Sequence, residues 1–254
     1  MKSNTAPQNK ALVVIPARMA SQRLPGKPLA DIGGVPMIVH VLQRALAANI
    51  GPVIVACSEP EVADAVRIAG GTAVMTDPDL PSGTDRVKAA ADIIDPDNTY
   101  QYVINVQGDL PTLDPLCVSA AAQVLRDTPT CDISTLVVAT TDAREISDPN
   151  VVKAVLSMDS DTQGRALYFT RASAPSGDGP VWHHVGIYGY RRDALNRFCA
   201  LSPSPLEIRE RLEQLRALEA GMRIDASVID SEPHGVDTPE DLARARALIL
   251  GSKS

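Results

Sequence analysis

The chain has 254 residues, of which 44% are hydrophobic and 22% charged, and these fractions exclude disorder over most of its length. Its 24 basic and 31 acidic residues give a net charge of −7, which argues against a general nucleic-acid-binding surface. No apolar run approaches the roughly 18 residues of a membrane span. Residues 1–10, which we expect to form a flexible tail, contain no apolar signal segment. We therefore expect a cytoplasmic protein without membrane or nucleic-acid partners.

The cysteines lie far apart in the sequence, and their spacing fits neither a CxxC pair nor a zinc finger. In a reducing compartment such cysteines are typically free thiols buried in the core. We therefore expect no disulfide among Cys57, Cys117, Cys131 and Cys199.

Between residues 12 and 138, short apolar runs of strand length alternate with segments of helical period. Ser58 followed by Glu61 predicts a capped helix that reaches about Ala69. The predicted strands are 12–15, 53–56, 73–75, 102–106 and 133–138, and the other predicted helices are 36–48, 85–94 and 115–126.

This alternation predicts an α/β fold with an open, mostly parallel central sheet and helices on both faces. In such sheets ligands bind outside the carboxyl ends of the strands. Functional residues are therefore expected in the loops 16–28, 76–86 and 107–112.

The second half of the sequence predicts a smaller mixed lobe with strands at 151–158, 167–169 and 185–190. Ser204-Pro205-Leu206-Glu207 combines an N-cap, a proline at N1 and a glutamate at N3, and it predicts a helix to about Gly221. A strand at 224–229 and a final helix capped at Thr238 complete the expected order.

The loop from Arg18 to Pro28 places Arg18, Arg23 and Lys27 directly after the first buried strand. Guanidinium and ammonium groups suit phosphate oxygens, and Gly26 allows close backbone approach. The loop matches neither the Walker A pattern nor GxGxxG. It is either a phosphate-binding loop or simply a solvated basic loop.

Two aspartates are candidate metal ligands. Asp109 follows the strand at 102–106, and Asp237 lies just before the final helix. Carboxylates in these places can hold Mg²⁺ against triphosphate oxygens. Either residue alone could instead be a turn or capping aspartate, so the stronger prediction is that both meet at one metal.

Three further segments carry polar side chains whose role the pattern leaves open. Ser82-Gly83-Thr84 either contacts a base or only begins a helix. His183 and His184 precede a predicted strand and should point to opposite faces, so joint metal ligation is not expected. Glu213-Gln214 either faces the cleft or forms the polar face of an amphipathic helix.

Several long stretches carry a family resemblance, among them IPARMASQRLPGKPL, SGTDR, NVQGD, ALYFTR, HHVGIYGYR, SPLEIRERLEQLR and GVDTPEDL. Together they resemble the 3-deoxy-D-manno-octulosonate (Kdo) cytidylyltransferase family from about Val13 to Leu248. The resemblance implies a Rossmann-like nucleotidyltransferase domain over 11–254, with a substrate and dimerisation lobe at about 150–225. It also implies a homodimer that makes CMP-Kdo and pyrophosphate from CTP and Kdo with Mg²⁺, for lipopolysaccharide synthesis.

The resemblance also implies a role for individual residues. The catalytic residues would be Arg18, Lys27, Asp109 and Asp237, with Asp109 and Asp237 as metal ligands. CTP would contact Arg18, Ser21, Arg23, Lys27, Ser82 and Gln107. Kdo would contact Gln107, Arg171, His184, Glu213 and Gln214.

The sequence departs from the family pattern at Leu110, where many relatives carry glutamate, and in the short segment between Arg171 and His183. Three alternatives stay open: a cytidylyltransferase for a related sugar acid such as 8-amino-Kdo, a hexose-1-phosphate nucleotidyltransferase, and a non-catalytic nucleotide-binding regulator.

Overall fold

The computed structural model describes residues 11–20, 23–230 and 233–251, so the predicted tail at 1–10 lies outside the described residues. The strands are β1 (Ala11–Pro16), β2 (Asp31–Ile32), β3 (Val35–Pro36), β4 (Val53–Cys57), β5 (Thr72–Met75), β6 (Tyr102–Asn105), β7 (Ile133–Thr140), β8 (Lys153–Met158), β9 (Gln163–Thr170), β10 (Val181–Arg191) and β11 (Ile224–Val228). The helices are η1 (Lys27–Leu29), α1 (Met37–Ala47), α2 (Pro60–Ile68), α3 (Gly83–Ile94), α4 (Pro115–Asp127), α5 (Ala143–Ser147), α6 (Arg192–Ala200), α7 (Pro205–Glu210), α8 (Gln214–Glu219) and α9 (Pro239–Gly251).

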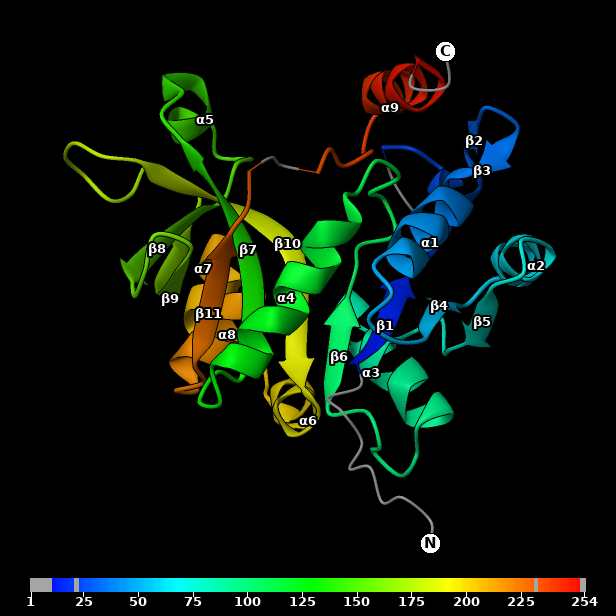
Figure 1. The fold of residues 1–254 in the computed structure, drawn as a ribbon, viewed down its shortest axis with the longest axis horizontal. Helices are drawn as coiled ribbons and strands as arrows, with labels where there is room; N and C mark the ends of the chain where they lie inside the picture. The colour runs from blue at the N-terminus through cyan, green and yellow to red at the C-terminus, as the bar shows by residue number, and fades with distance from the viewer. Residues whose placement is uncertain (1–10, 21–22, 231–232, 252–254) are drawn as a thin grey trace, which may run out of the picture.

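Nine of the strands form one sheet in the order β5-β4-β1-β6-β10-β7-β11-β9-β8, with β2 and β3 paired separately (Figure 1). The first four strands in this order are parallel neighbours. Their cores are apolar runs such as Leu12–Ile15, which is fully buried. The βα alternation predicted for the first half is confirmed, because runs buried on both faces suit inner parallel strands.

The second half of the chain continues the same sheet in mixed orientation. Strand β10 runs antiparallel between β6 and β7, and β9 is antiparallel to β11 and β8. The expected mostly parallel sheet therefore describes the edge from β5 to β6, while the complete sheet is mixed. In Figure 1 the arrow of β10 points opposite to those of β1 and β6.

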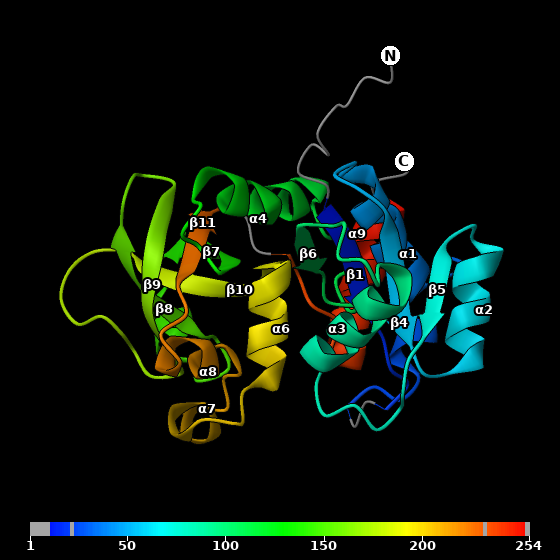
Figure 2. The same cartoon turned by 90° about the horizontal axis from the view of Figure 1, so that it is seen from below.

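Helices cover both faces of this sheet (Figure 2). One apolar core lies between the sheet and α1, α2 and α4, and a second lies between the opposite face and α3, α6 and α8. Helix α9 packs with β2 beyond the carboxyl end of β1. Because helices cover both faces of the sheet, a ligand can reach it only at the loops that follow the strand ends.

Three sequence predictions are wrong in detail. The helix predicted from Pro205 to Gly221 is split, because Arg211 adopts the left-handed conformation with φ 58° and ends α7. Helix α2 is preceded by Glu59 rather than capped by Ser58, since Pro60 occupies its first position. His183 and His184 lie within β10 and not before it.

The predicted caps at Ser204 and Thr238 and the free cysteines are confirmed. Ser204 and Glu207 form a capping box, and Thr238 accepts a hydrogen bond from the backbone N–H of Asp241 at 3.2 Å. All four cysteines are free, and burial raises the pKa of Cys57 and Cys117 to about 11. Among the described residues no helix has the length and apolarity to cross a bilayer.

Candidate active site

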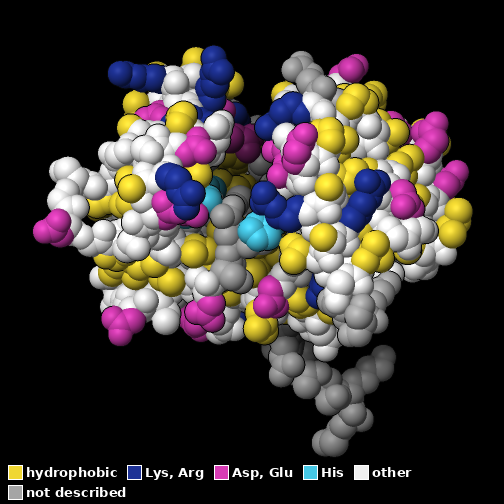
Figure 3. All heavy atoms as spheres, turned by 90° about the horizontal axis from the view of Figure 1, so that it is seen from above, with side chains coloured by type: hydrophobic (Ala, Val, Ile, Leu, Met, Phe, Trp, Pro, Cys, Tyr) yellow, Lys and Arg dark blue, Asp and Glu magenta, His cyan; other side chains and the backbone are white. Residues whose placement is uncertain are grey.

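The loops after β1 and β6 meet at the carboxyl edge of the sheet. A Cβ added at Gly108 would lie 2.6 Å from the carbonyl oxygen of Pro16, so a larger residue would separate these loops. The view onto this edge shows a hollow between the two halves of the molecule, with charged side chains on its rim (Figure 3). A hollow therefore lies at the edge of the sheet where the topology predicts a ligand site.

Lys27 stands at the centre of this edge. Gly26 adopts φ +70°, and this left-handed turn leads directly into η1, which begins at Lys27. The Lys27 ammonium donates to Asp109 Oδ2 at 2.8 Å and to Asp237 Oδ1 at 2.9 Å. One cation thus joins two carboxylates that are far apart in the sequence.

The two carboxylate loops are also tied through the main chain. The Val236 N–H donates to the carbonyl oxygen of Asp109 at 2.9 Å, which brings the next residue, Asp237, beside Asp109. Arg23 donates to the other oxygen of Asp237 at 2.8 Å. The structure therefore brings together four of the residues singled out from the sequence: Arg23, Lys27, Asp109 and Asp237.

Lys27 keeps its proton in this surrounding. Burial alone would lower the pKa of its ammonium, but the charges and hydrogen bonds of Asp109 and Asp237 outweigh burial and raise it. The side chain is therefore a permanent cation at neutral pH, suited to binding phosphate and unsuited to acting as a base.

Asp109 and Asp237 also fit a divalent cation. Their oxygens converge on one point, now held by the Lys27 ammonium, and Mg²⁺ is commonly bound by one or two carboxylates together with water and substrate phosphates. Within the described part of the chain, no group of three His, Cys, Asp or Glu side chains could hold a metal by itself.

The other predicted CTP contacts are placed less specifically. Arg18 is exposed just beyond β1, and Gln107 is half-buried just beyond β6. Ser82 is the N-cap of α3, where its hydroxyl accepts from the Asp85 N–H at 3.1 Å. This capping role is sufficient to explain why a serine occupies position 82. Ser21 lies outside the described residues.

His184 lies on the β10 face opposite to that of His183, as alternation predicts. Its Nε2 is 2.9 Å from the hydroxyl of Thr135, and its ring packs edge-on against Phe169 with centroids 5.0 Å apart. Thr135 also reaches the carbonyls of Val185 and Ile187, which favours His184 Nε2–H as the donor. Nδ1 is then left as an acceptor.

Burial, with a smaller contribution from His183, lowers the pKa of His184 to about 3, so this side chain should stay neutral above that pH. The unfolded chain takes up this proton near pH 6.5, so stability should fall as the pH drops from about 6.5 towards 3. Thermal unfolding of wild type and His184→Gln across this range measures the effect, which should be smaller in the variant. An imidazole that titrates near 6.5 by NMR would contradict it.

Arg171 is held by main-chain carbonyls. Its Nε donates to Glu210 O at 3.0 Å, Nη1 to Pro149 O at 2.9 Å and Nη2 to Arg211 O at 3.5 Å. The Glu210 carboxylate accepts in return from the Arg171 N–H at 3.1 Å. A guanidinium has five N–H donors, and the described residues accept from three of them, which leaves two for a sugar carboxylate.

Arg171→Ala should therefore have two effects. Losing the three carbonyl contacts should lower stability by about 2 kcal/mol, and losing the charge should raise KM for the sugar acid. Thermal unfolding and steady-state kinetics separate the two, with Arg165→Ala, on the exposed face of β9, as the control. A destabilised variant with an unchanged sugar KM would restrict Arg171 to a structural role.

Glu213 is the N-cap residue of α8 and Gln214 is its first residue, since the break at Arg211 ends the preceding helix. Gln214 is buried, with 7% of its surface exposed, and is not on a solvated helical face. Glu213 is half-buried and accepts from Thr84 Oγ1 at 2.6 Å. The polar-face interpretation of this pair is therefore wrong for Gln214.

Three contributors to the site escaped the sequence analysis. Glu59 accepts from the Met19 N–H at 3.1 Å and so fixes the start of the basic loop. Glu210 holds Arg171, and Thr84 holds Glu213. Only Thr84 carried a signal, since it lies in the singled-out segment 82–84.

Comparisons with known proteins show which family this chain belongs to. A cytidylyltransferase family model matches residues 12–224. The 3-deoxy-manno-octulosonate cytidylyltransferase of Parvibaculum lavamentivorans is 61% identical over 238 residues, covering 94% of this chain and 92% of that protein. The protein of the same name from Rhodopseudomonas palustris is 60% identical over 97% of this chain and 100% of its own length.

The chain belongs to the 3-deoxy-manno-octulosonate cytidylyltransferase family. A solved structure of CMP:2-keto-3-deoxy-manno-octonic acid synthetase complexed with CTP matches it with a TM-score of 0.88 and 42% identity, covering 96% of this chain and 99% of that one. A nucleotidyl transferase from Methanothermobacter shares the fold, with a TM-score of 0.62 at 17% identity. The α/β nucleotidyltransferase fold expected for this family is thereby confirmed.

Proposed function

We propose that this protein transfers CMP from CTP to the anomeric hydroxyl of Kdo and releases pyrophosphate, with Mg²⁺ as cofactor. Family membership supports the substrates. The observation that supports the chemistry is that Asp109 and Asp237 converge on the Lys27 ammonium of the basic loop, with Arg23 also bound to Asp237. The product supplies an activated sugar acid for lipopolysaccharide synthesis.

The main barrier to this reaction is electrostatic, because an anionic sugar must approach an anionic triphosphate. The positive charges of Arg18, Arg23 and Lys27 can lie beside the phosphate oxygens, and so reduce the repulsion between the triphosphate and the anionic sugar. When bound by Asp109 and Asp237, Mg²⁺ supplies further positive charge and lowers the pKa of the attacking hydroxyl. The protein itself provides positioning and charge, and no covalent nucleophile is needed.

The residues that the family resemblance assigns to the sugar carry groups that suit a sugar acid. The two available N–H groups of Arg171 suit the Kdo carboxylate, and Nδ1 of neutral His184 suits a sugar hydroxyl. Glu213 can accept from hydroxyls, and Gln107, half-buried just beyond β6, can both donate and accept. Because a hexose 1-phosphate has no carboxylate, this set favours a sugar acid.

Two further proposals concern assembly and compartment. Exposed Met158 and Leu167 lie on β8 and β9 at the sheet edge, which supports a homodimer formed through the lobe at about 150–225. Free cysteines support a reducing compartment, the cytoplasm. Light scattering of the purified protein measures the mass of the assembly, and a monomer would contradict the first proposal.

The reaction is tested by pyrophosphate release, crossing CTP, UTP, ATP and GTP against Kdo, 8-amino-Kdo, sialic acid and glucose 1-phosphate. We expect release with CTP and Kdo, abolished by a chelator and restored by Mg²⁺. Faster release with 8-amino-Kdo would move the substrate to that analogue. Folded protein that releases nothing with any pair would support the non-catalytic regulator.

A further inference from the structure

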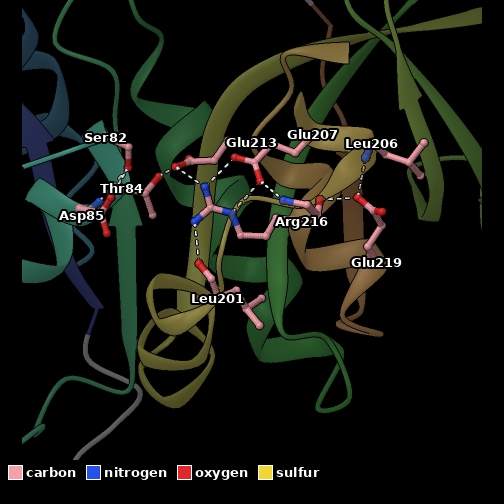
Figure 4. Close-up of polar contacts among 10 residues, drawn as sticks. Ser82, Thr84, Asp85, Leu201, Leu206, Glu207, Glu213, Arg216 and Glu219 are labelled. Atoms are coloured by element: carbon pink, nitrogen blue, oxygen red, sulfur yellow. Dashed lines mark hydrogen bonds and ion pairs between the residues drawn. The ribbon is translucent and has the colours of Figure 1, made fainter. Parts of the chain in front are cut away.

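A hydrogen bond joins the nucleotide half of the site directly to the sugar half. Thr84, in the first turn of α3, donates from Oγ1 to Glu213 Oε2 at 2.6 Å, across 129 positions of sequence. Thr84 is buried, with 4% of its surface exposed, and the Glu213 side chain is 34% exposed, so the bond is partly shielded from water. It ties the helix capped by Ser82 to the start of α8 (Figure 4).

The other carboxylate oxygen of Glu213 faces Arg216. Arg216 Nη2 lies 4.0 Å from Glu213 Oε1, while two bonds of 2.8 and 2.6 Å hold its guanidinium on Glu207. The same guanidinium lies 5.1 Å from the centroid of the Phe198 ring. Arg216 is thus held in place by Glu207, and its charge lies near the Glu213 oxygen that Thr84 does not contact (Figure 4).

Glu213 lies two residues after the break between α7 and α8, and its carboxylate is oriented by side-chain contacts. Arg211 ends α7 in the left-handed conformation, and Glu213 precedes the first residue of the next helix. Glu213 itself has a helical backbone conformation (φ −58°, ψ −36°), which fixes where its Cβ lies but not where its carboxylate points. Here the direction is set by Thr84 and Arg216.

We infer that Thr84 is a positioning residue for sugar binding, acting through the Glu213 carboxylate and linking the sugar subsite to the nucleotide-side helix α3. The inference rests on the proposed function, which assigns Glu213 to the sugar. It gives the threonine of the Ser82–Thr84 segment a role separate from base contact. Arg216 has the corresponding role on the second carboxylate oxygen.

Thr84→Val removes the hydroxyl at nearly constant volume, and Thr84→Ser keeps it. We expect Thr84→Val to raise KM for Kdo about tenfold, the effect of losing one hydrogen bond to a charged group, with KM for CTP within about twofold of wild type. Thr84→Ser should restore the KM for Kdo. The matched control is Thr99→Val, which removes a similar bond of 2.7 Å to Asp95 far from the site and should leave both KM values unchanged.

A double-mutant cycle separates positioning from general stability. In a Glu213→Ala background, Thr84→Val should add nothing to the KM for Kdo, whereas a purely structural threonine would add its effect in both backgrounds. Thr84→Ala, which cannot overpack the site, serves if the valine variant does not fold. A wild-type KM for Kdo in either folded variant would overturn the inference, while wild-type enzyme inactive with CTP and Kdo would overturn the proposed function instead.

Discussion

Asp109→Asn and Asp237→Asn are each expected to lower kcat by about a hundredfold or more while the protein stays folded. Each change removes one of the two charges that converge on the Lys27 ammonium, at 2.8 and 2.9 Å. The shape of the side chain is kept, so the loss is one of charge. Pyrophosphate release at saturating CTP and Kdo measures kcat, and circular dichroism measures folding.

The matched control for these variants is Asp64→Asn. Asp64 forms an ion pair of 3.2 Å with Arg67, and both side chains are exposed on α2. Exposed pairs contribute little to stability, so this variant should keep wild-type turnover. Near-normal kcat in either site variant would show that the two carboxylates do not share a catalytic metal.

Lys27→Ala should lower kcat/KM for CTP about a hundredfold. It should also lower the melting temperature, because it leaves Asp109 and Asp237 facing one another without the cation between them. Added Mg²⁺ should restore much of that stability in the variant, since the metal can take over the balancing charge. Melting curves with and without Mg²⁺ and kinetics against CTP measure both effects.

Lys88→Ala is the matched control for Lys27, because Lys88 pairs with Asp92 at 2.6 Å on a half-exposed surface of α3. It should change neither the CTP kinetics nor the Mg²⁺ dependence of melting. If Lys27→Ala keeps the wild-type kcat/KM for CTP, Lys27 has no part in the phosphate site.

The first half of the fold was predictable because its signals are local. Runs such as Leu12–Ile15 are buried on both faces, and the loops that follow such strands gather at one edge of a parallel sheet. That edge is where Lys27 and Asp109 meet. Asp237 could be predicted only as the second carboxylate of a shared metal site. In the structure, the hydrogen bond from the Val236 N–H to the Asp109 carbonyl oxygen holds Asp237 beside Asp109.

The second half was less predictable because its order depends on contacts between distant segments. Strand β10 inserts antiparallel between β6 and β7, and no local pattern specifies that neighbour. The break at Arg211 was also hidden, because a left-handed arginine has no sequence signal of the kind that glycine gives. Consequently the bonds from Arg171 to carbonyls and from Thr84 to Glu213 appear only in the folded structure.

The most direct test of the account is to measure CTP binding by calorimetry with and without Mg²⁺, in wild type, Asp109→Asn and Asp237→Asn. If the two carboxylates hold the metal together with the triphosphate, Mg²⁺ should tighten CTP binding strongly in wild type and only weakly in both variants. The same Mg²⁺ effect in all three proteins would contradict a metal shared by Asp109 and Asp237.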